Sequence, residues 1–585
     1  MPRHTAAIAG VCALTFLAGL GRPAVTDSDE AYYAEAAREM IERGDWLTPH
    51  YNDEIRFEKP VLYYWLAAAA YAAGGVSPAA ARLPSALAGI GLALLACACA
   101  RRWYDERTAL LAGIITATSF GYVAMARHAL PDLPLAFFVT LATWGAIVGL
   151  RIEPSRAGDH PSAQGWLIAA GAAAAGAFLV KGPVGLVLPA AVVAPLAAWT
   201  WLRERRPRAS RAALLAAVGV FLVLALPWYG AMAVEHGAAY VERFFIGENL
   251  ERFATPRYND PRPLWYYLPI VAGGLLPWTP FAVLWAPALG GAWRARRAGA
   301  TEFRLAWWAL APLAFYTLSV GKQPRYVLPV LPPLAVLLAA AMRRAAAPGT
   351  ERRGLLTGAA VASGLLVVLV AERLYAVRPL LVEWSGAWIP SLAGVVLVLG
   401  VAIVAAAAIS HRDRSRRGGF HGLVPALVAA ASVCLAVATY TVVLASPQRA
   451  PVERMAALVQ ESRDAGEPYC RYRVFTRNLV FYAGPPAAAP FSLEAVRDFL
   501  RRPDRVLCVL LESDAAQLEA DGLTLDRIGA VSYLDTGSLT FEALLDPDPA
   551  RYLRQVVLVS NRPSGSASSA AVRDPGGAHA AARFP

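Results

Sequence analysis

Long apolar runs recur along most of the chain, and short segments rich in charged residues separate them. A run of about 20 apolar residues can cross the hydrocarbon core of a membrane as a helix. Only 17% of the 585 residues are charged, against about 25% in a typical soluble domain. The pattern predicts a polytopic α-helical membrane protein with about 13 transmembrane helices. The runs are residues 6–25, 78–100, 107–126, 131–151, 165–180, 183–201, 211–232, 264–288, 304–320, 325–343, 355–375, 387–410 and 421–445.

Arginine clusters between consecutive pairs of runs predict the orientation. Short loops rich in Lys and Arg lie on the cytoplasmic side of membrane proteins, so each pair is expected to form an out-and-back hairpin. This interpretation makes residues 1–445 a membrane domain whose two long extracytoplasmic loops are residues 26–77 and 233–263. The shorter run 60–74 would be one crossing too many, so we expect it to enter the outer face without crossing. The net charge of +12 reflects this loop pattern and does not indicate nucleic acid binding.

Within the first loop, residues 29–43 have a helical pattern that Gly44 is expected to stop, which predicts a helix on the membrane surface. Residues 446–562 mix alternating and helical patterns, which predicts a small extracytoplasmic α/β domain. Cys470 and Cys508 in this domain could form a disulfide or stay free. The tail, residues 563–585, is rich in Ser, Gly and Ala and is predicted to be disordered. Strands are expected at 469–476, 479–482, 506–511 and 555–560, and helices at 452–463 and 493–501.

The outer turns of this topology hold most of the polar residues that could bind a ligand or take part in catalysis. The chain has 55 basic residues, and its three lysines, Lys59, Lys181 and Lys322, all fall at outer membrane edges. A compact ammonium group suits phosphate binding, so these lysines suggest an anionic lipid head group, although anchoring at the interface would also explain them. Asp29 and Asp132 fit either helix caps or a general base that activates a hydroxyl.

The segment DEAYYAEAAREMIERGDWLTPHYNDEIRFEKPVLYYW resembles the first periplasmic loop of bacterial transferases that attach aminoarabinose to lipid A. More broadly, it is similar to membrane glycosyltransferases of the GT-C fold that are related to protein O-mannosyltransferases. The resemblance implies this fold, a sugar donor built on a polyprenyl phosphate such as undecaprenyl phosphate, and inverting transfer on the outer face. Matching segments follow in order over roughly residues 5–345: ARHALPDLPLAFF, KGP, GENLERF, PRPLWYYLPIVAGGLLPW and GKQPRYVLPVLPPLA.

The resemblance also implies roles for residues that match the family's motifs. Asp29 and Asp132 match its two functional carboxylates. Glu58 and Lys59 match a pair that lies near the metal and the donor phosphate. Candidate ligands of the donor phosphate are Lys59, Tyr326, Arg252, Lys181 and Lys322, and candidate residues on the acceptor side are Asp27 and Glu30.

One position departs from the family. Where the aminoarabinose transferases have a His that helps to hold zinc, this chain has Asn249. Asparagine is a poor zinc ligand, but its oxygen suits a harder cation. The departure leaves two alternatives: another divalent ion held by Glu58 with Glu248 or Asn249, or no metal. It also puts zinc, and aminoarabinose as the sugar, in doubt.

The sequence thus predicts an inverting glycosyltransferase of the bacterial cytoplasmic membrane, with its site and its C-terminal domain outside. It would move one sugar from a polyprenyl phosphate to a lipid A-like or other envelope acceptor. The expected partners are this donor, an envelope lipid, glycan or protein acceptor, and membrane lipids, and we expect a monomer. A protein O-mannosyltransferase-type enzyme is one alternative, and a lipid-linked sugar flippase or a non-catalytic scaffold are others. A flippase would need ionisable residues or inverted repeats within the spans, and the spans offer few charges.

Overall fold

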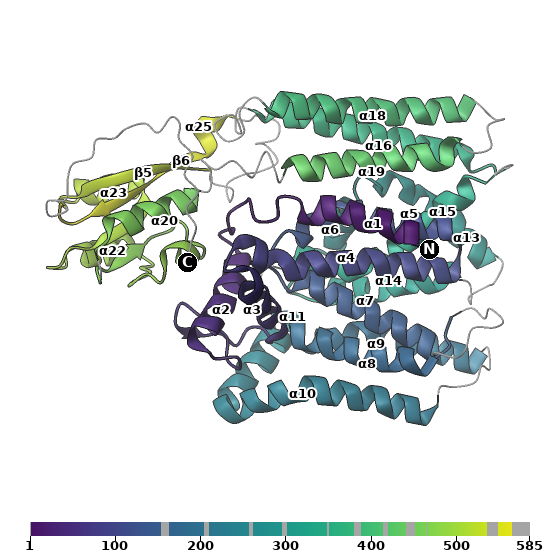
Figure 1. Ribbon diagram of the computed structural model, residues 1–585, viewed down its shortest axis with the longest axis horizontal. Coiled ribbons are helices and arrows are strands. Elements are labelled where there is room, and N and C mark those ends of the chain that lie inside the picture. Colours follow the sequence, from purple (N-terminus) through teal and green to yellow (C-terminus); the bar gives the residue numbers. More distant parts are fainter. Residues whose placement is uncertain are drawn as a thin grey trace. The chain divides into compact units, whose positions relative to one another are not determined.

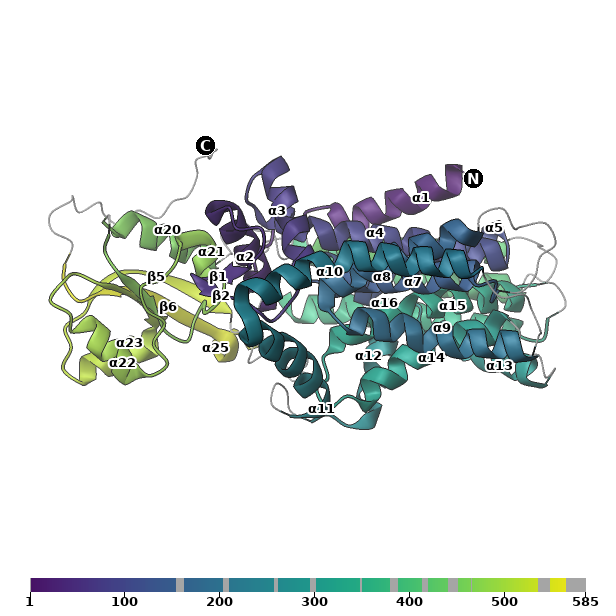
Figure 2. The ribbon, with the colours of Figure 1, turned by 90° about the horizontal axis from the view of Figure 1, so that it is seen from below.

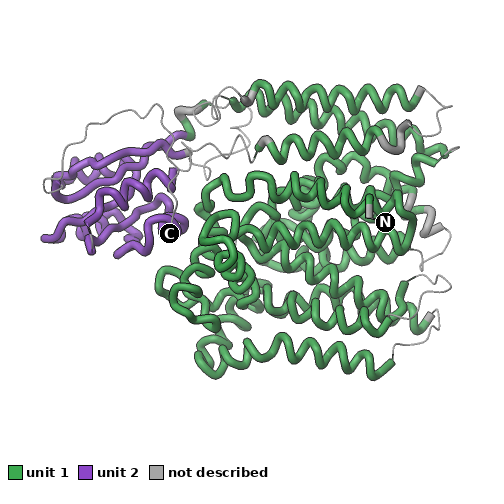
Figure 3. The backbone as a smooth tube through the Cα atoms, in the orientation of Figure 1, with its two compact units in different colours: residues 1–450, 536–552 green, residues 451–535, 553–585 purple. Residues whose placement is uncertain are grey.

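The computed structural model describes residues 2–153, 163–203, 210–256, 261–294, 301–347, 350–378, 388–412, 419–439, 451–464, 466–534 and 548–563. The chain divides into two compact units (Figure 3), of which unit 1 is residues 1–450 with 536–552 and unit 2 is residues 451–535 with 553–585. Residues 564–585, for which the sequence predicts disorder, lie outside the described residues. The same is true of parts of several arginine clusters on which the predicted orientation rests.

Unit 1 is a bundle of helices. Both Figure 1 and Figure 2 show α4, α7, α8 and α10 running along one another, and these helices contact in the order α4–α7–α8–α10. Its helices are α1 (Pro2–Cys12), α2 (Asp29–Arg43), α3 (Leu62–Gly74), α4 (Pro78–Trp103), α5 (Glu106–Thr118), α6 (Phe120–Ala126), α7 (Asp132–Gly149), α8 (Ala163–Lys181), α9 (Val184–Arg203), α10 (Arg211–Val241), α11 (Arg252–Ala254), α12 (Tyr267–Gly274), α13 (Trp285–Arg294), α14 (Thr301–Leu318), α15 (Leu331–Ala345), α16 (Arg353–Ala376), α18 (Trp388–Arg412), α19 (Gly419–Ala438) and α25 (Pro549–Tyr552). Shorter helical turns are η1 (Ala13–Leu17), η2 (Glu242–Glu251), η3 (Leu264–Tyr266), η4 (Thr279–Leu284) and η5 (Pro324–Val330), and β1 (His50–Tyr51) pairs with β2 (Glu54–Ile55).

Among the described residues, eight helices are long and apolar enough to cross a membrane, or up to ten spans if each of two bent pairs counts as one. The chain is therefore a multi-pass membrane protein, as its apolar runs predict. Of these eight, Pro324–Ala345 has 94% of its apolar window buried, whereas Arg211–Ala254 has 22%. The first thus lies inside the bundle, and the second leaves most of its surface open to lipid. The count of about 13 helices and the orientation stay predictions.

The apolar run 264–288 is bent in the middle, so it forms either a broken span or a re-entrant loop. Its two halves, Leu264–Gly274 and Thr279–Pro287, meet at an angle of 113°. Gly273 and Gly274 weaken the first helix, and Pro277 lacks the N–H that a continuing helix needs. α5 and α6 form a milder bend of 56°.

The segment 233–263, predicted as a loop, is largely helical in its described part. α10 runs to Val241 across a non-helical Gly237, and η2 with α11 continues the helix to Ala254. This helical backbone places Glu248 and Arg252 one turn apart, with Arg252 Nη2 3.0 Å from Glu248 Oε2. Residues four apart face the same way on a helix, so both side chains can serve one site.

The first apolar run also ends earlier than predicted, because α1 and η1 stop at Leu17. α2 has the predicted bounds: the Ser28 side chain caps its start by accepting a hydrogen bond from the Glu30 N–H, and Gly44 ends it with φ of 68°. A positive φ suits glycine. α2 contacts α3 and α4 and buries Glu30 and Glu35, and its place at a membrane surface stays a prediction. α3 has 13 residues, too few to cross a membrane.

Unit 2 confirms the predicted α/β character, with a four-stranded sheet in the order β3-β4-β6-β5. β3 and β4 are parallel, and the other two pairs are antiparallel. Its elements are α20 (Pro451–Ser462), β3 (Tyr469–Arg471), α21 (Leu479–Ala483), α22 (Leu493–Leu500), β4 (Leu507–Leu511), α23 (Glu512–Ala520), β5 (Asp526–Leu534) and β6 (Leu553–Ser560).

The predicted elements of unit 2 differ from the structure in detail, and the strand expected at 469–476 ends at Arg471. The run 479–482 is helical and not a strand, because it packs on α20 and a short apolar run does not itself distinguish the two structures. The sequence pattern also missed β5. Cys470 and Cys508 face each other in the β3–β4 register as buried free thiols, so the disulfide alternative is not formed in this structure.

Candidate active site

Two cavities of unit 1 share part of their lining. The polar cavity has a volume of about 210 Å³ and the apolar cavity about 420 Å³. Both are lined by Glu58, Lys59, Lys181, Arg252 and Tyr326. The polar cavity is completed by Asp29, Tyr32, Tyr33, Arg56, Pro131, Asp132 and Arg325. The apolar cavity is completed mainly by aromatic and aliphatic side chains, among them Val184, Val187, Phe244, Phe245, Phe253 and Phe315.

The wall common to both cavities carries several cations. Lys59 Nζ and Arg252 Nη2 each lie 3.0 Å from Glu248 Oε2. Lys181 Nζ stands 4.4 Å from the centre of the Tyr326 ring. Lys59 and Arg252 therefore share a single carboxylate, and the excess positive charge suits a phosphate group. Four of the five predicted phosphate ligands are brought together at this wall.

The two predicted catalytic carboxylates, Asp29 and Asp132, are connected through Arg325. Arg325 Nη2 donates to Asp29 Oδ2, and Arg325 Nε lies 3.2 Å from Asp132 Oδ2. Lys181 Nζ donates to the other oxygen of Asp132. Two cations and two carboxylates thus form one linked group on the polar cavity.

The two carboxylates differ in their exposure to solvent, and this difference indicates different roles. The Asp29 side chain is 42% exposed, whereas that of Asp132 is 4% exposed. A group that takes a proton from a substrate must reach it, which favours Asp29. Asp132 is held between Lys181 and Arg325 and is better placed to orient them.

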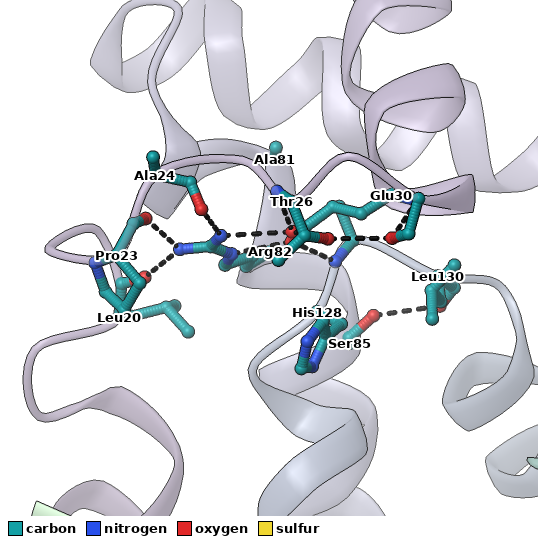
Figure 4. Close-up of polar contacts among 12 residues, drawn as sticks. Leu20, Pro23, Ala24, Thr26, Glu30, Ala81, Arg82, Ser85, His128 and Leu130 are labelled. Carbon is teal, nitrogen blue, oxygen red and sulfur yellow. Dashed lines mark hydrogen bonds and ion pairs between the residues drawn. The ribbon is translucent and has the colours of Figure 1, made fainter. Parts of the chain in front are cut away.

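Next to Asp29 in the chain, Glu30 forms a buried ion pair with Arg82 of α4 (Figure 4). Arg82 Nε lies 2.7 Å from Glu30 Oε1, and Nη2 lies 3.1 Å from Oε2. The guanidinium thereby ties α4 both to the start of α2 and to the segment that follows η1. In that segment it donates to the carbonyl oxygens of Leu20 at 2.9 Å, Pro23 at 2.7 Å and Ala24 at 2.8 Å.

The Glu30 carboxylate also holds two loops in place. It accepts hydrogen bonds at 2.9 Å from Thr26 N, Thr26 Oγ1 and Ala129 N. Ala129 belongs to the turn that leads into α7 and Asp132, and Glu30 is the neighbour of Asp29. The buried Glu30 carboxylate therefore holds the backbone on which Asp29 and Asp132 of the polar cavity are carried.

Three predicted site residues lie elsewhere. Glu30 is fully buried in its contacts with Arg82 and lines neither cavity. Asp27 also lines neither cavity. Lys322 is 6% exposed and donates to the carbonyl oxygens of Ser319 at 2.5 Å and Arg262 at 3.3 Å. Its ammonium group thus donates to backbone carbonyls, and Lys322 lines neither cavity.

Two arginines of the polar cavity received no role from the sequence. Arg325 directly precedes Tyr326 in the segment GKQPRYVLP, and its charge next to a candidate phosphate ligand was the available signal. Arg56 lies within the first matching segment, two residues before Glu58. Its position in the site is visible only in the structure, where tyrosines of α2 and α3 surround its side chain.

Two of the three candidate metal ligands are engaged by other groups of the protein, whereas Glu58 Oε2 is buried without a hydrogen-bond partner among the described residues. Glu248 is engaged by Lys59 and Arg252, and Asn249 Nδ2 donates to the Phe244 carbonyl at 2.8 Å. Within the described part of the chain, no group of three or more His, Cys, Asp or Glu side chains could hold a metal ion.

The sequence of the chain matches known proteins over its N-terminal half and beyond. The family described as Dolichyl-phosphate-mannose-protein mannosyltransferase matches residues 20–239. An "Undecaprenyl phosphate-alpha-4-amino-4-deoxy-L-arabinose arabinosyl transferase" of Pseudomonas aeruginosa (strain UCBPP-PA14) is 36% identical over 332 residues, which is 56% of this chain and 58% of that protein. A protein of the same name from Pectobacterium carotovorum subsp. carotovorum (strain PC1) is 33% identical over 420 residues, 70% of this chain and 71% of the relative. This chain thus spans little more than half of the first relative.

A solved structure extends the likeness to nearly the whole chain. The crystal structure of ArnT from Cupriavidus metallidurans bound to undecaprenyl phosphate matches with a TM-score of 0.72 at 24% sequence identity. The match covers 96% of this chain and 98% of that one. The same protein in the apo state matches with a TM-score of 0.70. The two proteins share a fold, which confirms the predicted GT-C architecture.

Proposed function

The chain belongs to the family of the undecaprenyl phosphate-alpha-4-amino-4-deoxy-L-arabinose arabinosyl transferases, and on that premise we propose that it is an inverting glycosyltransferase. Its donor is a single sugar on a polyprenyl phosphate, and its acceptor is an envelope lipid or glycan at the outer face of the cytoplasmic membrane. One observation supports this most: a polar cavity adjoins an apolar cavity across a cationic wall. A lipid-linked sugar has the matching order of an apolar prenyl chain, an anionic phosphate and a polar sugar.

In this proposal the prenyl chain lies in the apolar cavity, the phosphate at the shared wall and the sugar in the polar cavity. Asp29 accepts the proton of the acceptor hydroxyl as its oxygen attacks the anomeric carbon. The bond between this carbon and the phosphate oxygen breaks as the new glycosidic bond forms, and polyprenyl phosphate leaves. Lys59 and Arg252 stabilise the charge that develops on the phosphate. A single displacement inverts the anomeric centre.

A second acceptor class has its own support. The match of residues 20–239 to protein mannosyltransferases favours a protein hydroxyl as the alternative acceptor. The reaction would be the same, because a serine or threonine hydroxyl and a glycan hydroxyl both need a base.

Purified protein in lipid vesicles is expected to release labelled sugar from an undecaprenyl-phosphate donor only when an acceptor is supplied. The measurement is transfer of label to lipid A, to envelope glycan extract or to a serine-containing peptide, with heat-inactivated protein as the control. Mass spectrometry of the product identifies the acceptor. Absence of transfer to every acceptor, while the donor binds, would contradict the proposed enzyme.

Donor use is expected to weaken as the pH rises through about 8. Burial lowers the pKa of Lys59 to about 8, and the nearby Glu248 limits that fall. Below this pH the ammonium is charged and can bind phosphate; above it the charge is lost. The decline should appear in kcat/KM for the donor, which reports ionisation in the free enzyme.

Two variants test this assignment. Lys59→Arg keeps a positive charge at all these pH values, so the decline near pH 8 should disappear while donor binding persists. Lys59→Met should raise the KM for the donor about tenfold or more, since charge-assisted contacts to phosphate are strong. An unchanged pH profile in Lys59→Arg would assign the decline to another group.

A further inference from the structure

Arg56 is held in a cage of tyrosines on the wall of the polar cavity. Its guanidinium carbon stands 4.4 Å from the centre of the Tyr32 ring and 5.7 Å from that of Tyr33. Nε donates to Tyr64 Oη at 3.1 Å. Aromatic faces attract a cation and restrict its orientation, so the guanidinium is fixed before any substrate arrives.

The terminal nitrogens of Arg56 are available to a ligand. Among the described residues, Nε is the one guanidinium nitrogen with a hydrogen-bond partner. The nearest carboxylate contact is Glu58 Oε2, at 3.8 Å from Nε. That distance is too long for a hydrogen bond. Arg56 itself lines the polar cavity together with Asp29.

The charges around the polar cavity fall into three groups, and two of them carry an excess of positive charge. Lys181 and Arg325 are balanced by Asp29 and Asp132. The other two groups are Lys59 and Arg252 around Glu248, and Arg56 and Arg243 around Glu58. In each, two cations share one carboxylate.

The donor phosphate accounts for one of these two excess charges. A sugar-linked polyprenyl phosphate is a diester with a single negative charge, and the Lys59–Arg252 wall adjoins the apolar cavity where its lipid would lie. The charge at Arg56 remains, on the side of the polar cavity that the apolar cavity does not share. A second anion would balance it.

We propose that Arg56 is a specificity-determining residue that binds a carboxylate or phosphate group carried by the transferred sugar or by the acceptor. A planar guanidinium binds both groups with two parallel hydrogen bonds. The relatives are named for the transfer of an amino sugar, which is cationic at neutral pH and would be repelled here. This inference rests on the proposed glycosyl transfer and concerns its substrate.

Two arms of one experiment distinguish the sources of the anion, both with the full chain in vesicles. The first compares undecaprenyl-phosphate donors that carry a uronic acid, a neutral hexose or 4-amino-4-deoxy-arabinose, with one neutral acceptor. The second compares phosphorylated and dephosphorylated lipid acceptors with the neutral donor. Wild-type protein should prefer the anionic substrate in one arm by about tenfold or more.

Arg56→Met should abolish that preference by lowering kcat/KM for the anionic substrate and leaving the neutral one nearly unchanged. Arg56→Lys should restore part of it, because the charge remains without the planar pair of donors. Equal losses for neutral and anionic substrates in Arg56→Met would show a structural role and overturn the inference alone. A wild-type preference for the amino sugar would overturn it too. Absence of turnover with every donor would instead overturn the glycosyltransferase on which it rests.

Discussion

Sugar transfer is expected to fall by about 100-fold or more when Asp29 is replaced with asparagine, because a positioned general base contributes about that much to the rate. Asparagine keeps the size of the side chain but cannot take the proton of the acceptor hydroxyl. Asp29 is 42% exposed on the polar cavity and Arg325 retains its contact with Asp132. The fold should therefore survive the change. The measurement is turnover of labelled donor at saturating acceptor.

Glu42→Gln is the matched control for Asp29→Asn. Glu42 lies on the same helix, is 60% exposed and contacts Arg38 on the outer side of α2. The same chemical change there should leave turnover within about twofold, since exposed ion pairs contribute little. Donor binding should be nearly normal in both variants. Turnover close to that of the wild type in Asp29→Asn would remove Asp29 from the chemistry.

The elements that build the site could largely be predicted because their signals are local. The bounds of α2 follow from helical spacing between a serine cap and a stopping glycine. The apolar runs give the spans because each must bury its own backbone in hydrocarbon. Lys59, Lys181 and Tyr326 could be proposed from charge at predicted outer turns and from motifs. The structure then places all three on the wall shared by the two cavities.

What the sequence could not give depends on contacts between distant segments. Glu30 and Arg82 are 52 residues apart, so no local pattern distinguishes Glu30, which is buried, from Asp29, which reaches the cavity. Lys322 carries the same charge as Lys181, yet backbone carbonyls occupy it. The bend within 264–288 arises from glycines and prolines, whose effect on the backbone a hydrophobicity pattern does not detect. Tertiary packing decides the first two of these cases, and local backbone chemistry decides the third.

The largest loss of stability is expected from single changes that break the Glu30–Arg82 pair. Glu30→Gln or Arg82→Met leaves a charge buried without its partner, which costs about 3–5 kcal/mol. Both side chains are at most 2% exposed, so water cannot replace the missing group. Thermal unfolding of the purified chain in detergent measures the loss. Glu42→Gln is the control, because Glu42 is 60% exposed and lies 3.4 Å from Arg38 on the same helix, and losing this contact should cost less than about 1 kcal/mol.

Acid should weaken the same contact. Burial alone would raise the pKa of Glu30, but the Arg82 guanidinium outweighs it and lowers the pKa to about 2. In the unfolded chain a glutamate has a pKa of about 4.3. Since the folded value is the lower one, the contribution of Glu30 to stability is complete above about pH 4.3 and is lost as the pH falls toward 2. Between these values the wild type should lose more stability than Glu30→Gln. Parallel acid curves would contradict the assignment.

The double variant Glu30→Gln/Arg82→Met separates the charge from the positions that the pair holds. Removing both charges should recover part of the stability that either single variant loses, because no buried ion is left alone. Transfer should not recover with it. The carbonyl oxygens of Leu20, Pro23 and Ala24 would lose their Arg82 donors, and Ala129 N would lose a charged acceptor. The segments that carry Asp29 and Asp132 would then move against each other. Stability that returns without activity would identify the pair as a positioning device for the site; activity that returns in proportion to stability would reduce its role to folding alone.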